Sequence, residues 1–190
     1  MAKVWDIKKL KDLSKGDKKQ LLQDAYDLGF KYERDYHGCS QAAFGALQEL
    51  FDISEPMAFK AACGLAGGFG ATNQEMCGAL TGGCMFYSML YGRTRDKIED
   101  PDRQRFTAYH GCTELRDKYF DEWGSATCKE VMMEQMHRMG KGRQWFKLTV
   151  PEEFEEFMKL GGHLEVAPDI VGKACMWTAE AILEKETKSK

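Results

Sequence analysis

Three of the seven cysteines stand where the sequence predicts a helix to begin. Cys39 follows a break at Gly38, Cys77 ends a polar loop, and Cys128 comes directly after Thr127. The first turn of a helix carries unpaired N–H groups and the positive end of the helix dipole, which favour a thiolate over a thiol. Thiolates bind metals and attack disulfides, so these cysteines are candidate ligands, and we expect lowered thiol pKa values.

The tetrapeptide Tyr-His-Gly-Cys occurs twice, ending at Cys39 and at Cys112. The first copy lies at a predicted helix boundary, where Gly38 allows the chain to turn. The second lies inside a predicted helix, where Gly111 would instead permit the close approach of another helix. The flanking sequences share no wider similarity, so we interpret the repeat as accidental and not as a duplicated domain.

The other four cysteines, Cys63, Cys84, Cys112 and Cys175, lie inside predicted helices. In such places a cysteine is usually a small buried hydrophobic residue. Cys84 is two helical turns beyond Cys77 on the same face, about 10 Å along the axis. That separation is too large for both to bind one ion, but both could line one cavity. Cys84 is therefore a fourth candidate metal ligand.

A glycine-rich stretch, GLAGGFGATNQEMCGALTGG, surrounds Cys77. It matches neither the Walker pattern nor a GxGxxG preceded by a strand, which argues against a nucleotide site. Two interpretations remain. The glycines could bring backbone N–H groups close to sulfur, with Gly70 and Gly78 as candidate cofactor-binding positions, or they could let helices pack closely.

Composition narrows the classes of function. The chain has 27 Lys and Arg against 30 Asp and Glu, a net charge of −3, so nucleic acid and anionic membranes are not expected partners. It lacks the run of about 20 apolar residues that spans a bilayer. The odd cysteine count, without CxxC, argues against a disulfide framework, a thioredoxin-type pair and c-type haem. With no secretory signal pattern, we expect a soluble, cytoplasmic protein.

Amphipathic periodicity predicts an all-α fold, a single compact multi-helix domain around the glycine-rich loop and a buried central helix at 77–92. The domain would cover residues 1–190, with 1–16 as an N-terminal extension and 186–190 as a charged tail. Helix starts are expected at polar residues followed by proline or glutamate. The predicted starts are Ser54 with Pro56, Asp100 with Pro101, Thr127 with Glu130, and Thr149 with Pro151.

The cysteine pattern resembles that of a known family. CGALTG at 77–82 is similar to a CGAxxG motif, with CSQAA upstream and FDEWGSATCKEV downstream. The chain from about 20 to 185 resembles the redox-active protein family named for its C…CGAxxG…C…C pattern. It also resembles the C-terminal part of split-Soret cytochromes c, for which a non-haem iron–sulfur centre is proposed. The resemblance implies an all-helical fold and suggests a homodimer in which both chains supply ligands.

The resemblance places three of the family's cysteines on Cys39, Cys77 and Cys128. The fourth is expected just before the last helix, where this chain has Ala167 in VAPDIV. Either three thiolates act with another ligand, or a different cysteine substitutes. The substitutes left open are Cys175, Cys84, Cys63, His163 and His37.

Three functional hypotheses follow from these residues. The first is a redox protein that holds an iron–sulfur cluster of the [2Fe–2S] type and exchanges electrons with a redox partner protein, as an oxidoreductase or an electron-transfer component. The second is a metal-free thiol–disulfide enzyme or sensor. The third is a helical domain in which a metal such as zinc only stabilises the fold.

Overall fold

The structure, a computed structural model, describes residues 3–188. Over this range the chain forms helices and no named strand, which confirms the all-α prediction and the single compact domain. Within the same range no helix is both long and apolar enough to cross a membrane. The elements are η1 (Ile7–Asp12), α1 (Lys15–Tyr36), α2 (Cys39–Phe51), α3 (Pro56–Ala61), η2 (Ala62–Leu65), α4 (Gly78–Tyr91), η3 (Arg95–Lys97), α5 (Gln104–Trp123), α6 (Cys128–Arg138), α7 (Pro151–Lys159), the π-helical turn η4 (Gly162–Val166) and α8 (Ala167–Lys188).

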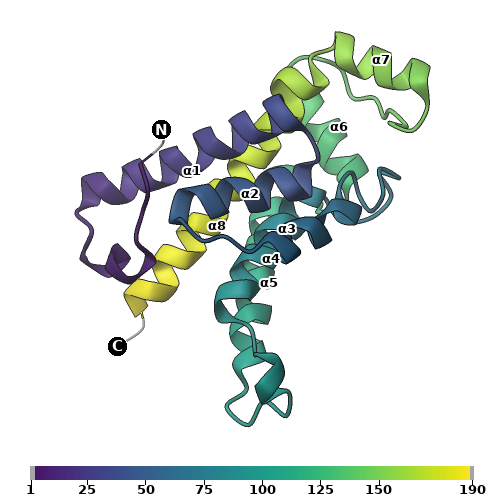
Figure 1. The fold of residues 1–190 in the computed structure, drawn as a ribbon. Coiled ribbons are helices and arrows are strands. Elements are labelled where there is room, and N and C mark those ends of the chain that lie inside the picture. The colour runs from purple at the N-terminus through teal and green to yellow at the C-terminus, as the bar shows by residue number, and fades with distance from the viewer. Residues whose placement is uncertain (1–2, 189–190) are drawn as a thin grey trace.

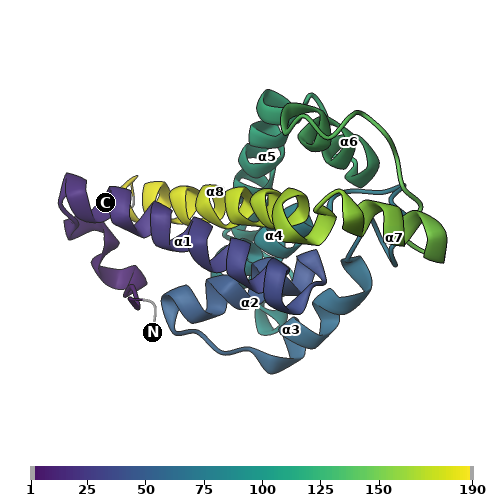
Figure 2. The ribbon, with the colours of Figure 1, turned by 90° about the horizontal axis from the view of Figure 1, so that it is seen from above.

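The last helix, α8, is the axis of the fold. It runs beside α1 along most of its length and also contacts α2, α4 and α5 (Figure 1). Seen from above, α2 and α3 lie on one side of α8, and α5 and α6 lie on the other (Figure 2). Helices on several sides explain why α8 buries apolar residues around most of its circumference. Examples are Ile170, Val171, Ala174, Ala179 and Ile182.

The predicted central helix is α4, which packs against α2, α5 and α8. Its small residues allow this close packing. A Cβ at Gly82 would overlap the backbone oxygen of Ser40 in α2. In the facing helix α5, a Cβ at Gly111 would overlap the Tyr87 ring of α4. The second Tyr-His-Gly-Cys copy therefore serves helix packing, as predicted, and lies in mid-helix.

The predicted helix starts are partly wrong. Thr127 is the N-cap of α6, but its side chain makes no capping hydrogen bond, so the predicted capping box does not form. Helix α5 begins at Gln104 and not at Asp100, because the backbone has positive φ at Asp100 (53°) and at the N-cap Arg103 (54°), which an α-helix does not accommodate. The N-caps of α3 and α7 are Glu55 and Val150, in place of Ser54 and Thr149.

The segment predicted as an extension packs against the domain. Trp5 and Leu10 are buried, and the Trp5 indole donates a hydrogen bond to Asp24 at 2.9 Å. Helix η1 contacts α8, and α1 begins at Lys15, inside the predicted extension. In the predicted charged tail, residues 186–188 belong to α8, whereas 189–190 lie outside the described residues.

Gly82→Ala should lower the free energy of unfolding by about 1–3 kcal/mol, because the added methyl meets backbone and α2 must shift. Urea denaturation measures this change. Gly16→Ala in α1 is the control, since a Cβ there has only the Ser14 hydroxyl near it, at 3.7 Å. Gly16→Ala should be neutral or stabilising, and equal losses in both variants would contradict the packing argument.

Candidate metal centre

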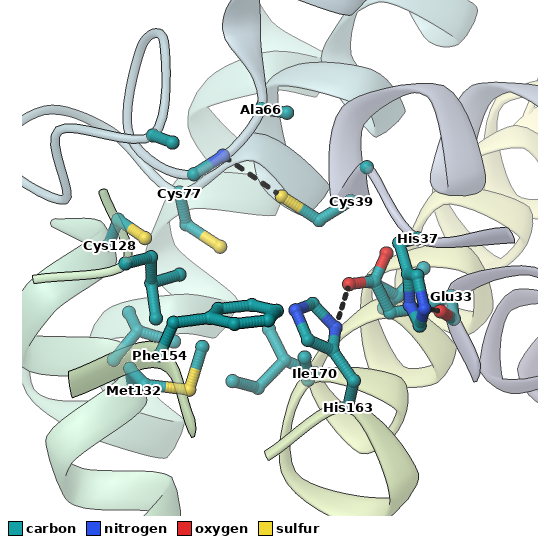
Figure 3. Close-up of a pocket in the computed structure, with 17 residues that line it drawn as sticks. Glu33, His37, Cys39, Ala66, Cys77, Cys128, Met132, Phe154, His163 and Ile170 are labelled. Atoms are coloured by element: carbon teal, nitrogen blue, oxygen red, sulfur yellow. Dashed lines mark hydrogen bonds and ion pairs between the residues drawn. The ribbon is translucent and has the colours of Figure 1, made fainter. Parts of the chain in front are cut away.

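A cavity of about 270 Å³ lies where the starts of several helices meet. This is roughly twenty times the ~10–15 Å³ that one water molecule requires. Cys39, Cys77 and Cys128 all line it, so the structure brings the three helix-start cysteines together (Figure 3). The apolar part of the lining is Val131, Met132, Leu148, Phe154, Ile170 and Val171.

Three helices begin at this cavity, and a fourth, α8, continues there from η4. Cys39 is the first residue of α2, Cys77 is the N-cap of α4, and Cys128 is the first residue of α6. Ala167, the first residue of α8, lines the same cavity. The position where the resemblance places a fourth cysteine is thus in the site, but it carries a methyl group. The converging helix starts favour negative charge in the cavity.

A short antiparallel contact fixes Cys77 relative to Cys128. Met76 and Thr127, the residues before the two cysteines, form an isolated β-bridge. The Cys77 N–H donates to the Ala126 carbonyl at 2.9 Å, and the Cys128 N–H donates to the Glu75 carbonyl at 2.8 Å. The starts of α4 and α6 are therefore tied together by backbone hydrogen bonds.

The glycine-rich loop, residues 66–76, supplies hydrogen-bond donors to two of the sulfurs. The Gly67 N–H donates to Cys39 Sγ at 3.3 Å, and the Asn73 side-chain amide donates to Cys128 Sγ at 3.7 Å. Asn73 is 1% exposed and is also held by its own N–H, which donates to the Gly67 carbonyl at 2.8 Å. Sequence reasoning missed Asn73, although a buried amide just before the cysteine motif fits such a role.

The third sulfur lies at the start of its own helix. Cys77 is the N-cap of α4, and its side chain makes no capping hydrogen bond, although the nearby backbone N–H groups of Ala79 and Leu80 and the Tyr119 hydroxyl partly offset the rise in the Cys77 pKa that burial causes. Two of the three sulfurs, those of Cys39 and Cys128, therefore have an N–H donor in the structure, an arrangement that stabilises thiolates bound to metal.

The two candidate glycines differ in their placement. A Cβ at Gly78 would lie 2.5 Å from Cys39 Sγ, so glycine is required there for the sulfur to enter the cavity. Gly70 has a positive φ of 60° and no atom within 4 Å of an added Cβ. Gly70 is absent from the cavity lining, so its role is confined to the path of the loop.

The expected lowering of the thiol pKa values is wrong for the metal-free protein. Burial raises the pKa of Cys39, Cys77 and Cys128. The negative charge of Glu33 adds to this for Cys39, and the neighbouring Cys77 adds to it for Cys128. Loss of solvation therefore outweighs the helix dipole and the N–H donors until a cation compensates the charge.

The other candidate thiols lie elsewhere. Cys84 is absent from the cavity lining and lies against Cys112 of α5, whose thiol donates to the Cys84 carbonyl at 3.7 Å. Cys175 is buried in α8, with its thiol 3.6 Å from the Ala43 carbonyl. Cys63 is exposed, contrary to the prediction of a buried residue. The structure groups none of these four with the cavity thiols.

Polar residues form the opposite wall of the cavity. Glu33 lies in α1, His37 is the C-cap of α1, and His163 comes from η4 (Figure 3). Sequence reasoning named both histidines as open alternatives but missed Glu33, which its i, i+4 spacing to His37 could have revealed. Tyr119 of α5 was also missed. Burial, and secondarily the nearby Cys77 thiol, hold the pKa of Tyr119 well above its usual value.

The donor set fits a thiolate-bound metal centre. Three sulfurs meet in an apolar cavity, two of them with N–H donors, and Gly78 leaves space for the Cys39 sulfur. Two sulfurs on one zinc ion lie at most about 4.6 Å apart, since each Zn–S bond is about 2.3 Å. Among the described residues, the cysteine sulfurs do not form a trio with every pair within 4.8 Å.

Comparison with known proteins gives one match. Residues 37–180, most of the chain, match the model of a family described as "Putative redox-active protein (C_GCAxxG_C_C)". The chain reads Cys77-Gly78-Ala79-Leu80-Thr81-Gly82, so it keeps the AxxG spacing with the preceding glycine and cysteine in reverse order. No curated protein and no solved structure matches, and the likeness to split-Soret cytochromes stays a prediction. The chain belongs to the C_GCAxxG_C_C family of putative redox-active proteins.

Proposed function

We propose that Cys39, Cys77 and Cys128 hold an iron–sulfur cluster and that the protein transfers electrons to or from a redox partner protein. The observation that carries this proposal is the meeting of three helix-start thiols in one cavity, where Cys39 and Cys128 each accept an N–H hydrogen bond. An iron–sulfur cluster, once bound, supplies one-electron redox chemistry. A [2Fe–2S] cluster needs four protein ligands, and the fourth family position is Ala167.

The surroundings of the thiols would influence the reduction potential of such a cluster. Hydrogen bonds to sulfur and the converging helix starts stabilise negative charge, whereas the apolar lining excludes water and opposes it. Phe154 lines the cavity and is 38% exposed, so a partner could approach the centre from the side of α7. The chain's own contribution is therefore to hold the ligands, limit solvent access and bias the reduction potential.

Anaerobically purified protein should contain iron and acid-labile sulfide, with visible absorption and an EPR signal on reduction. Cys77→Ser should lose both elements, because Cys77 is central to the thiol group. Cys175→Ser is the matched control, since Cys175 is equally buried but lies outside the cavity lining. Wild-type protein that lacks iron and sulfide even after anaerobic reconstitution would refute the cluster.

Ala167→Cys should slow the loss of iron to a chelator several-fold, because it adds a thiol at the cavity position that corresponds to the fourth family cysteine. Ala179→Cys, a buried change on α8 away from the cavity lining, is the control. Iron release at the wild-type rate in Ala167→Cys would show that a fourth thiolate does not complete the ligand set.

One observation favours metal-free thiol chemistry as a second candidate function. Cys84 of α4 and Cys112 of α5 interact, and this interaction lowers the pKa of the Cys112 thiol and raises that of Cys84. Cys112 is thus the more reactive partner of a pair that could lose two electrons and two protons to an oxidant and form a disulfide.

In the metal-free protein, alkylation should modify exposed Cys63 first, and Cys39, Cys77 and Cys128 should resist, because burial keeps them protonated. Mass spectrometry of peptides after timed alkylation measures the order. Treatment with a mild oxidant, followed by the same peptide mapping, distinguishes the iron–sulfur function from metal-free thiol chemistry. A disulfide confined to Cys84 and Cys112, in protein that binds no iron, would favour the second candidate.

A further inference from the structure

Glu33, His37 and His163 form a compact group on the wall of the cavity that faces the thiols (Figure 3). One potential ligand atom from each residue lies within 4.8 Å of those of the other two. Metal–nitrogen and metal–oxygen bonds of about 2.0–2.2 Å place two ligands of one ion at most ~4.4 Å apart. Small side-chain rotations would therefore suffice for all three residues to bind one ion.

Glu33 is buried without a hydrogen bond to its carboxylate. The residue is 1% exposed in a mostly apolar cavity, and its Oε2 accepts no hydrogen bond in the structure. Oε1 lies 3.2 Å from His163 Nδ1, the distance of an ion pair when the ring is protonated, but the two atoms make no hydrogen bond, and Nδ1 has no other hydrogen-bond partner. A buried carboxylate oxygen that is neither hydrogen-bonded nor metal-bound is unfavourable. Glu33 Oε2 and His163 Nδ1 are thus two buried polar atoms without hydrogen bonds on neighbouring side chains, and a cation bound between these side chains would satisfy both.

His37 is oriented as a metal ligand. Its Nδ1 lies 3.0 Å from the Glu33 backbone carbonyl, which can only accept, so Nδ1 carries the proton and Nε2 is left with a lone pair. Metal-bound histidines usually have this second hydrogen bond to a carbonyl or carboxylate. The His37 backbone has φ 61° and ψ −178°, a conformation that is strained for a non-glycine residue. This strained backbone brings the ring to 4.5 Å from that of His163, between centroids.

His163 is set by a rare element. It lies on the π-helical turn η4, a kind of turn that often occurs at functional sites. Its ring packs edge-on against Phe157 at 5.4 Å and lies 6.0 Å from Phe154. These contacts restrict the ring to the cavity side of η4, toward Glu33.

We propose that Glu33, His37 and His163 bind one divalent first-row transition-metal ion, in a second site that shares the cavity with the three thiols. Two imidazoles and one carboxylate are the ligands of many catalytic zinc and non-haem iron sites, and they leave coordination positions open. Those open positions would face the cavity, where a small molecule could bind the ion. This site goes beyond the proposed electron transfer and does not depend on a cluster.

Cobalt(II) is the probe for a test that removes competing thiols. The variant Cys39→Ser/Cys77→Ser/Cys128→Ser should bind one Co²⁺ per chain, with d–d absorption and no thiolate-to-cobalt charge-transfer band. Adding Glu33→Gln or His163→Gln should weaken binding by at least about 100-fold, because losing an outer-shell partner alone costs 10–100-fold. His110→Gln, on the exposed face of α5, is the matched control and should bind as the parent does. Unchanged affinity in the Glu33 and His163 variants would overturn the proposal.

If the triple variant fails to fold, zinc binding to the wild-type chain, with all its cysteines, provides a second and independent test. X-ray absorption at the zinc edge should show that His163→Gln removes only nitrogen and oxygen neighbours and lowers the zinc content by one ion per chain. Loss of sulfur neighbours in His163→Gln would overturn the proposal. So would loss of iron and sulfide from that variant, because His163 would then be the fourth cluster ligand.

Discussion

The hydrogen bonds of the glycine-rich loop at 66–76 hold the thiol site together. Gly67 donates to Cys39 and Asn73 donates to Cys128, so one short segment contacts sulfurs on two different helices. To do this the loop takes positive φ at glycines and also at Phe69, Ala71 and Asn73. Such backbone is unfavourable unless surrounding contacts enforce it. The helices therefore set the positions of the Cys39 and Cys128 sulfurs. The hydrogen bonds to these sulfurs hold the loop in its strained conformation.

Two opposing electrostatic effects meet in this cavity. Helix starts and N–H donors favour thiolate, whereas the apolar surroundings raise the pKa of all three thiols. In the metal-free chain, burial prevails and the thiols stay protonated. A bound cation reverses the balance, because its charge is the largest in the site and the same donors then act on thiolates. Metal binding at these cysteines would consequently release protons and strengthen as pH rises.

Local sequence signals predicted the helix starts at Cys39, Cys77 and Cys128, but they did not predict that these starts meet. Glycines and polar caps mark where a helix begins, whereas the meeting point depends on how α2, α4 and α6 pack in the fold. Cys84 illustrates the limit. It does share a face of α4 with Cys77, yet the cavity lies beyond the end of that helix and not along its side. Asn73 was missed for the same reason, since its burial is a tertiary property.

The two walls of the cavity differ in the metals that they suit. Thiolates are soft ligands that favour iron–sulfur clusters, whereas imidazole and carboxylate suit a single zinc or iron ion. Ala167, where the resemblance places a fourth cysteine, lines the cavity with a methyl group. Under the two proposals the thiol set has three members, and His163 and Glu33 act with His37 as a group of their own. If both proposals hold, the space between the walls is where a redox centre and an open metal ion would contact the same small molecule.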